Sequence, residues 1–216
     1  MKEKTYQENL LKLFAKDYPD PKTELIFKND YQLLISVVLS AQCTDKKVNH
    51  VTPELFKAYP DFKSLGEAKK TAVEKIIKPI NYYITKSKNI IETGKMVSAH
   101  YGGKIPTSHE EIVKLPGVGR KTANVVLGEL GLEKTLPVDT HVMRVSARLG
   151  LSSGKNPDKV EDELKVQFAP ETWRNLHHYL ILHGRRICKA QNPNCEDCHL
   201  NKVCPSAFAF ERPAKN

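Results

Sequence analysis

The sequence lacks any long apolar run and is short of acidic residues. Its longest apolar stretch, LLISVVL at residues 33–39, falls well below the roughly 20 residues that cross a bilayer. The opening MKEKTYQENLLKLF is too polar for a secretory leader. Lys and Arg outnumber Asp and Glu by 34 to 25, which gives a net charge of +9 and favours nucleic acid as a partner over a membrane. We therefore expect a cytoplasmic, nucleoid-associated protein.

Strand patterns, internal repeats and low-complexity tracts are also lacking. Apolar residues instead recur at helical spacing from end to end, which predicts an all-α fold. Residues 31–42 are apolar on almost every side and predict a buried helix. The other expected helices span residues 44–59, 64–79, 86–103, 108–115, 120–131, 139–149, 156–169 and 170–188.

One of the turns between these helices is rich in glycine. IVKLPGVGRKTANVV has the form helix, Pro-Gly-Val-Gly turn, helix. We expect Gly117 and Gly119 to permit positive φ and to let the backbone approach another surface closely. The unpaired N–H groups and the positive end of the following helix would form an anion site that suits a DNA phosphate. These residues alone leave an ordinary helical hairpin open as the alternative.

Two cations, Arg120 and Lys121, stand at the start of that helix, where the macrodipole disfavours positive charge. A phosphate docked between them would offset this cost. Lys121 also lies off the apolar stripe, so it can face a cleft. A lysine nucleophile must be neutral, and Arg120, the helix end and partial burial would each favour the neutral amine. Lys121 is therefore a candidate for Schiff-base chemistry.

Asp139 in PVDTHVMR begins a further helix and is followed by Val142 and Val145 on its inward face. Two interpretations remain open for this carboxylate. It is either a helix N-cap only, or a general base or electrostatic stabiliser that works with the lysine.

Four of the five cysteines share one segment near the C-terminus. Because disulfides are rare in cytosolic proteins, metal is the first alternative. Four thiolates within 17 residues could hold zinc or a 4Fe-4S cluster, and the spacing alone leaves both open. We expect His199, a competing ligand, to be solvated, and Cys43 to be a small packing residue. The C-x6-C-x2-C-x5-C pattern consists of Cys188, Cys195, Cys198 and Cys204.

PGVGRKTA followed closely by VDTHV, together with this cysteine spacing, resembles the endonuclease III family of bifunctional DNA glycosylases. The likeness runs from about residue 25 to residue 205. It implies that Lys121 attacks the sugar C1′ and that Asp139 assists. It also implies that the four cysteines bind a 4Fe-4S cluster.

The resemblance further implies two helical domains on either side of a DNA-binding cleft. One would be a six-helix barrel at residues 21–132 that contains the helix-hairpin-helix at about 108–131. The other would join residues 1–20 to residues 133–216 and carry the cluster loop at 188–204.

Two further segments resemble DNA-contacting parts of the family. LSAQCTD places Gln42 where the family inserts a glutamine into the gap left by an extruded nucleotide. NYYITKSKNI matches a segment that normally begins Gly-hydrophobic-Tyr; here Asn81 replaces the glycine and Tyr82 takes the wedge position. The remaining expected DNA contacts are Leu115, Gly117, Val118, Gly119, Arg120 and Lys189.

The function implied is that of a base-excision-repair glycosylase and AP lyase. It would act as a monomer, away from membranes, on duplex DNA containing damaged bases or abasic sites, and would remove oxidised pyrimidines after flipping them out. One alternative is a monofunctional adenine or mismatch glycosylase; Lys121 and the end at Asn216, with no added C-terminal domain, both argue against it. The other is a non-catalytic DNA-binding module with structural zinc.

Overall fold

The computed structural model describes residues 2–210, and no strand lies among them, so the predicted all-α class is confirmed. The chain divides into two compact units, each with its own buried apolar core. The contiguous segment Glu24–Glu133 forms one, called here the central unit. The other, the split unit, combines the residues up to Thr23 with those from Lys134 onward. Among the described residues, no helix is long and apolar enough to span a membrane.

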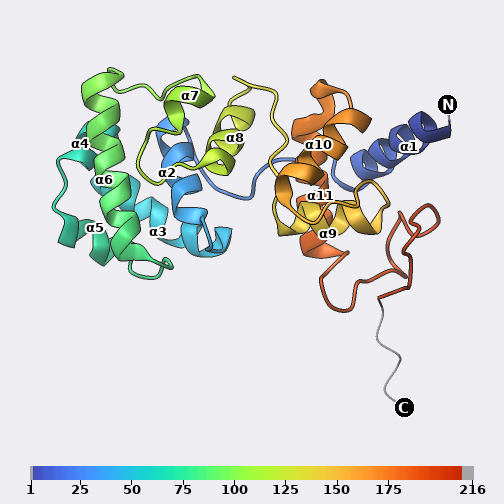
Figure 1. Ribbon diagram of the computed structural model, residues 1–216. Helices are drawn as coiled ribbons and strands as arrows, with labels where there is room; N and C mark the ends of the chain where they lie inside the picture. Colours follow the sequence, from blue (N-terminus) through green and yellow to red (C-terminus); the bar gives the residue numbers. More distant parts are fainter. Residues whose placement is uncertain (1, 211–216) are drawn as a thin grey trace, which may run out of the picture. The chain divides into compact units, whose positions relative to one another are not determined.

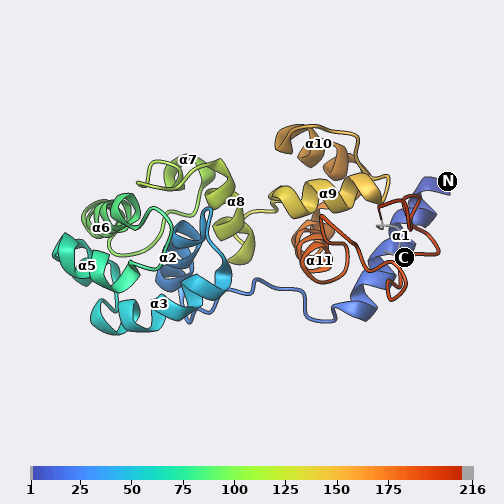
Figure 2. The same ribbon diagram turned by 90° about the horizontal axis from the view of Figure 1, so that it is seen from below.

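In the central unit, α2 (Asp30–Ser40) is the buried helix predicted from its apolar sequence. It packs against three other helices of the unit (Figures 1 and 2). The Asn29 side chain starts α2 by accepting a hydrogen bond from the Gln32 backbone N–H. The remaining helices are α3 (Asp45–Ala58), α4 (Phe62–Gly66), α5 (Lys70–Ile77), α6 (Tyr83–His100), α7 (His109–Ile112) and α8 (Arg120–Glu129), of which α3, α6 and α8 contact α2.

The single helix expected at residues 64–79 is wrong, because the structure has α4 and α5 there. The α4 helix begins earlier, at a capping box of Asp61 and Ser64. Its last residue, Gly66, lies so close to α6 that a Cβ there would stand 2.7 Å from the Lys95 backbone nitrogen. This close approach to Gly94 of α6 holds α4 in place, and α5 starts afresh at Lys70.

In the split unit, Phe14 of α1 (Lys2–Asp17) stacks on Tyr179 of α11 (Trp173–Arg186), with ring centroids 5.4 Å apart. The α11 helix also packs closely on α9 (Thr140–Arg148), and Gly184 leaves room for the α9 side chains. The helix expected at 170–188 begins as a 3₁₀ turn at Pro170–Thr172 and ends at Arg186. The unit also contains α10 (Pro157–Gln167).

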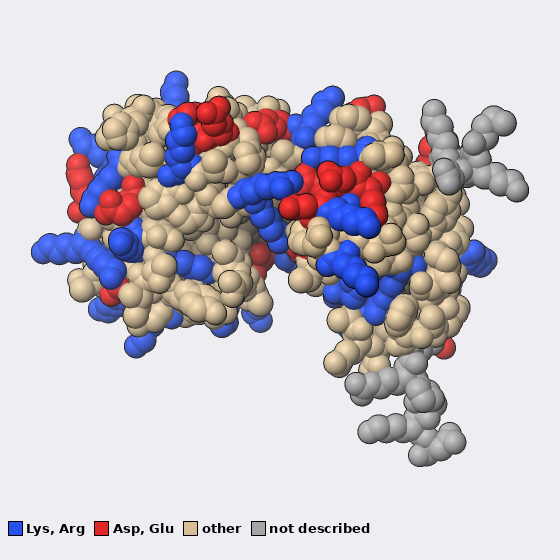
Figure 3. All heavy atoms as spheres, viewed as in Figure 1, with Lys and Arg blue, Asp and Glu red and all other residues tan. Residues whose placement is uncertain are grey.

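Charged side chains of both signs cover the surface. Figure 3 shows Lys and Arg on both units, with Asp and Glu interspersed among them. On this face the cations therefore do not gather on one unit alone.

Candidate active site

The turn between α7 and α8 is fixed against α6. Gly117 has φ +79°, and a Cβ at this position would lie 2.9 Å from the Asn89 side-chain nitrogen. The buried hydroxyl of Thr93 donates a hydrogen bond of 2.9 Å to the Pro116 carbonyl. Gly117 is therefore required both by its backbone conformation and by the side chain beside it. Asn89 and Thr93 were missed by sequence reasoning, since they lie on a different helix from the hairpin motif.

The second glycine of the turn has a different role. Gly119 has φ −89° and precedes α8 as its N-cap, so the expected positive φ is wrong at this position. An added Cβ would meet no atom within 4 Å. Gly119 has no side chain, and the structure gives α8 no side-chain cap hydrogen bond at this N-cap position. The start of α8 is thus open to an approaching anion.

The apolar residues of the turn face inward. Leu115 is 2% exposed and Val118 is 5% exposed, and both belong to the core of the central unit. Their side chains are not available to DNA, which leaves their backbone for any contact. Gly117, Gly119 and Arg120 are exposed.

Lys121 lies in the first turn of α8 and is exposed, so the partial burial expected for it is wrong for the protein alone. Among the residues that the structure describes, its side chain has no ion-pair partner. The amine therefore stands exposed at the start of α8.

Asp139 belongs to the split unit, where it is the N-cap of α9. Its Oδ1 accepts hydrogen bonds of 2.8 Å from the backbone N–H groups of His141 and Val142. The preceding Pro137 carbonyl accepts a 2.7 Å hydrogen bond from His177 Nδ1, which fixes the chain before the cap. The half-buried carboxylate is thus an N-cap held in one orientation.

A chain of contacts links this helix start to the first cysteine. Arg144 Nη2 lies 3.1 Å from His141 Nδ1 and donates to the Gly184 carbonyl at 2.9 Å. Arg144 Nε donates to the Cys188 carbonyl at 3.1 Å. Burial lowers the pKa of His141 and favours a neutral ring, which can accept from the guanidinium. Sequence reasoning missed Arg144, although its spacing of four residues from Arg148 puts both arginines on one helix face.

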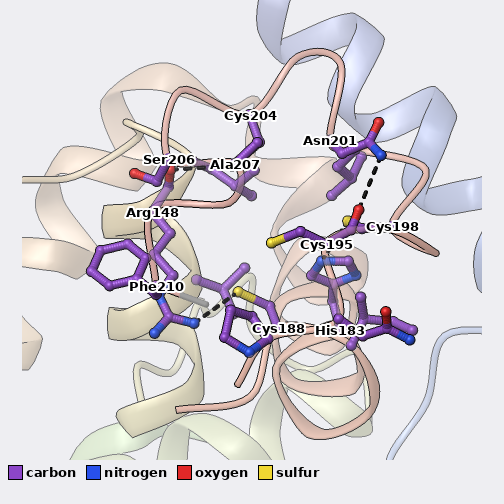
Figure 4. Close-up of a pocket in the computed structure, with 16 residues that line it drawn as sticks. Arg148, His183, Cys188, Cys195, Cys198, Asn201, Cys204, Ser206, Ala207 and Phe210 are labelled. Atoms are coloured by element: carbon purple, nitrogen blue, oxygen red, sulfur yellow. Dashed lines mark hydrogen bonds between the residues drawn. The ribbon is translucent and has the colours of Figure 1, made fainter. Parts of the chain in front are cut away.

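The four cysteines line one cavity of about 30 Å³ in the split unit (Figure 4). Arg148 lies on one side of it, with Nη1 donating to the Cys188 sulfur at 3.3 Å. On another side, His183 Nε2 is 3.6 Å from the Cys198 sulfur. The Cys204 thiol donates to the Arg148 carbonyl at 3.5 Å. The rest of the lining is largely apolar, with Val145, Leu149 and Leu200 among its residues.

The electrostatics of this cavity suit a bound cationic group. Burial, with a smaller contribution from charge on the other three cysteines, raises the pKa of the Cys198 thiol to about 11. The pKa of Cys204 is also raised, mainly by burial. Four thiolates would therefore need a cationic group beside them. Within the described part of the chain, no three His, Cys, Asp or Glu side chains are grouped to hold a single metal ion.

His199 and Cys43, which the sequence offered as a possible competing ligand and as a fifth cysteine, do not line this cavity. The exposed His199 pairs with Asp17 on α1, as expected of a solvated side chain. Cys43 is half-buried against the core of the central unit, which confirms it as a packing residue. Lys189 is exposed, and its carbonyl accepts a 2.7 Å hydrogen bond from Arg148.

The two expected wedge residues lie in the central unit, on loops joined by a side chain. Gln42 and Tyr82 are both exposed and both have a left-handed backbone, with φ of 54° and 58°. Asn81 Nδ2 donates to the Gln42 carbonyl at 2.7 Å. The structure thus brings these two segments together, 39 residues apart in sequence.

Comparison with known proteins agrees with this geometry. The model of the HhH-GPD superfamily of base excision DNA repair proteins matches residues 35–170, a span that includes Lys121 and Asp139. Endonuclease III of Rickettsia felis is 47% identical over 90% of this chain and 92% of its own length. Endonuclease III of Bacillus subtilis is 43% identical over 87% of this chain and 86% of its own.

Solved structures give the same result. The fold is similar to that of a trapped covalent intermediate of endonuclease III with DNA, an estranged-adenine complex, with a TM-score of 0.88 and 40% identity. That match covers 95% of this chain and 97% of the other. A thermostable thymine-DNA glycosylase, 22% identical with a TM-score of 0.83, shares the fold. The chain therefore belongs to the HhH-GPD superfamily of base excision DNA repair proteins and, within it, to the endonuclease III family of DNA glycosylases and AP lyases.

Proposed function

We propose that this enzyme removes oxidised pyrimidines from duplex DNA and then cleaves the strand 3′ to the abasic site, with Lys121 as the nucleophile. The observation that carries this proposal is the exposed amine at the uncapped start of α8, directly after a glycine turn. The similar endonuclease III structure was trapped as a covalent intermediate with DNA, which supports an enzyme-bound route.

The proposed chemistry involves one amine and one carboxylate. Lys121 Nζ, as the neutral amine, bonds to C1′ while the C1′–N bond to the base breaks, and the base leaves with the electron pair and takes up a proton. Ring opening gives an imine between Nζ and C1′. Loss of a C2′ proton then expels the 3′ phosphate, which is β-elimination. Asp139 assists as a base or by stabilising positive charge on the sugar. Desolvation of the exposed lysine would come from the bound DNA.

We assign DNA binding to the hairpin, the two wedge residues and the cluster loop. Phosphate would accept hydrogen bonds from backbone N–H groups of the turn and the α8 start, and Arg120 would add its charge. The DNA contacts predicted for the turn would thus be made by backbone atoms, at Leu115, Gly117, Val118 and Gly119. Gln42 and Tyr82 would fill the gap left by the flipped nucleotide. Lys189 would contact phosphate from the split unit.

We further propose that the cysteine cavity holds a 4Fe-4S cluster. Its ligands would be Cys188, Cys195, Cys198 and Cys204, which share one largely apolar cavity. Zinc would bind all four sulfurs about 2.3 Å from one ion, and the C-x6-C-x2-C-x5-C spacing shared with the endonuclease III family favours the cluster instead. In a 4Fe-4S cluster each thiolate binds a separate iron, so more widely spaced sulfurs suit it. When bound, the cluster would offset part of the negative charge of the four thiolates and would join the C-terminal loop to the end of α11.

Iron and sulfide analysis tests this assignment. The purified protein should contain about four irons and four sulfides per chain and show visible iron–sulfur absorption. Cys198→Ser should lose most of both, whereas Cys43→Ser should keep them. Stoichiometric zinc in place of iron would contradict the proposal and favour a structural zinc site.

The nucleophile is tested by borohydride reduction during reaction with duplex DNA that contains an oxidised pyrimidine. The wild type should form a covalent adduct, and Lys121→Gln should reduce it by at least about 100-fold. Lys104→Gln, which changes another exposed lysine of the central unit, is the matched control and should trap normally. Base release without any trapped adduct would instead indicate a monofunctional glycosylase. An undiminished adduct from Lys121→Gln would refute the assignment of the residue.

The remaining expectations concern the setting of the reaction. We propose a monomer that acts in the cytoplasm, associated with the nucleoid, on duplex DNA with damaged bases or abasic sites. The net charge of +9 supports association with DNA. We also propose that the hairpin unit binds the lesion and that the cysteine-bearing unit is the cluster domain.

A further inference from the structure

Two exposed residues of the central unit hold a backbone conformation that side chains rarely adopt. Gln42 and Tyr82 are the only non-glycine residues with positive φ among those described in this unit. Each such residue costs on the order of 1–3 kcal/mol and persists only where its surroundings hold it. Tyr82 is 66% exposed, so burial of its ring does not hold it. The restraint must come from neighbouring groups.

Two side chains of the 81–86 segment supply that restraint. Asn81 Nδ2 donates to the Gln42 carbonyl at 2.7 Å. Lys86, only 7% exposed in the first turn of α6, donates from Nζ to the carbonyls of Leu39 at 2.8 Å and Ala41 at 2.6 Å. The ammonium thus binds the C-terminus of α2, where the helix dipole favours a cation. Asn81 and Lys86 together bind three carbonyls, those of Leu39, Ala41 and Gln42.

The bond from Asn81 differs from the two bonds of Lys86. Lys86 is buried and fixes the end of α2, so its removal would disturb the fold. Asn81 is exposed, lies next to Tyr82, and binds the carbonyl of Gln42 itself. Its amide oxygen accepts a hydrogen bond of 3.5 Å from Lys47 Nζ, which is also exposed. Asn81 therefore couples the two loops without forming part of the core.

We propose that Asn81 is a positioning residue that joins the Gln42 and Tyr82 loops into one two-pronged wedge. The two side chains then enter the duplex together, and the Tyr82 ring stacks on the purine left opposite the lesion. The inference rests on the proposed function, because it requires a flipped nucleotide. Base–aromatic stacking is effective only when the ring stands at the correct height in the stack, and the Asn81 bond sets the Tyr82 loop against the Gln42 loop.

The test uses duplex DNA with a tetrahydrofuran abasic analogue placed opposite 2-aminopurine, whose fluorescence reports stacking. Asn81→Ala should weaken binding about 3- to 10-fold and reduce the fluorescence change on binding, while the thermal melting curve stays close to that of the wild type. Asn81→Asp should be at least as defective, because a carboxylate cannot donate to the Gln42 carbonyl. A wild-type result for Asn81→Asp would overturn the proposal.

A double-mutant cycle separates coupling from general damage. If Asn81 acts through the wedge, its replacement should matter little once both wedge side chains are gone. Adding Asn81→Ala to the Gln42→Ala, Tyr82→Ala double variant should therefore change the DNA dissociation constant less than twofold. If Asn81→Ala weakens binding by the same factor in the double variant as in the wild type, the proposal is contradicted. Asn49→Ala removes another asparagine that bridges two segments of this unit, through the Glu24 carbonyl at 2.8 Å, and should leave the 2-aminopurine signal unchanged.

Failure of the wedge proposal can be distinguished from failure of the proposed function. Borohydride trapping by the wild type tests Lys121 chemistry without any change at Asn81. Absence of any trapped adduct in the wild type would remove the proposed function, whereas normal trapping with an unchanged 2-aminopurine signal in Asn81→Ala would remove only the wedge coupling.

Discussion

At the residue scale, the two proposed catalytic groups differ in how the fold holds them. Lys121 is exposed on the first turn of α8, whereas Asp139 is fixed by two backbone hydrogen bonds to the same carboxylate oxygen. The N-cap role of Asp139, which the sequence left as one of two interpretations, is therefore real. It does not compete with a chemical role, because capping fixes the orientation that chemistry would need.

Asp139→Asn separates these two roles. Asparagine caps helices about as well as aspartate, so α9 should stay intact and the melting temperature should change little. Base release should slow by about 100-fold or more, since the amide carries no charge and accepts no proton. Single-turnover release of an oxidised pyrimidine and gel-shift binding of the same duplex measure the two effects.

Asp139→Ala provides the comparison, because it should lose the chemistry and also about 1 kcal/mol of stability. A normal release rate in Asp139→Asn would limit the residue to capping.

Sequence reasoning was most effective for residues whose role is local. The N-cap position of Asp139 was expected from its type and its place before a helix, and it is confirmed. It failed for residues whose role depends on a partner far along the chain. Lys86 and Arg144 bind carbonyls 45 and 40 residues away, at Ala41 and Gly184, and no local pattern indicates this.

At the element scale, the helix-hairpin-helix joins a rigid turn to an open helix start. Gly117 and Gly119 were predicted to share one backbone role, but the structure separates them. Gly117 has positive φ and lies against Asn89, while Gly119 has an ordinary φ, and a Cβ added there would meet no atom within 4 Å. Position 117 is thus constrained by the fold, and position 119 is free to serve an approaching ligand.

The two glycines should therefore respond differently to alanine. Gly117→Ala should destabilise the protein by about 1–3 kcal/mol, because it combines backbone strain with a 2.9 Å approach to Asn89. Gly119→Ala should leave stability nearly unchanged yet weaken DNA binding, because the new methyl group would stand where phosphate approaches. Denaturant unfolding and binding to an abasic duplex distinguish the two effects. Equal effects of both variants on binding and stability would contradict this division.

The element boundaries show what periodicity misses. The apolar spacing of residues 64–79 predicted one helix, but the contact of Gly66 with Gly94 of α6 separates α4 from α5. Such a break depends on tertiary packing, so the pattern of one segment cannot reveal it. The buried helix α2 was predicted correctly because its apolar residues face core on nearly every side.

At the scale of the whole molecule, positive charge should govern affinity for undamaged DNA. Each phosphate contact contributes about 0.9 to the slope of log affinity against log salt concentration. If Arg120 contacts phosphate, Arg120→Gln should reduce the slope by about 1 and weaken binding equally to damaged and undamaged duplexes. Fluorescence anisotropy over a series of salt concentrations measures this.

Lys104→Gln makes the same change in charge elsewhere on the central unit and should leave the slope unchanged. A slope that also stays unchanged in Arg120→Gln would remove that residue from the DNA interface.

The split unit, which takes residues from both ends of the chain, affects the order of synthesis. Helix α1 is made before the other helices of this unit, and Tyr179, on which its Phe14 stacks, is made 165 residues after Phe14. Residues 24–133 are contiguous and can fold while translation continues. The nascent α1, with its apolar face uncovered, must wait until α11 emerges, so the cysteine-bearing unit can mature only after α11 has been made.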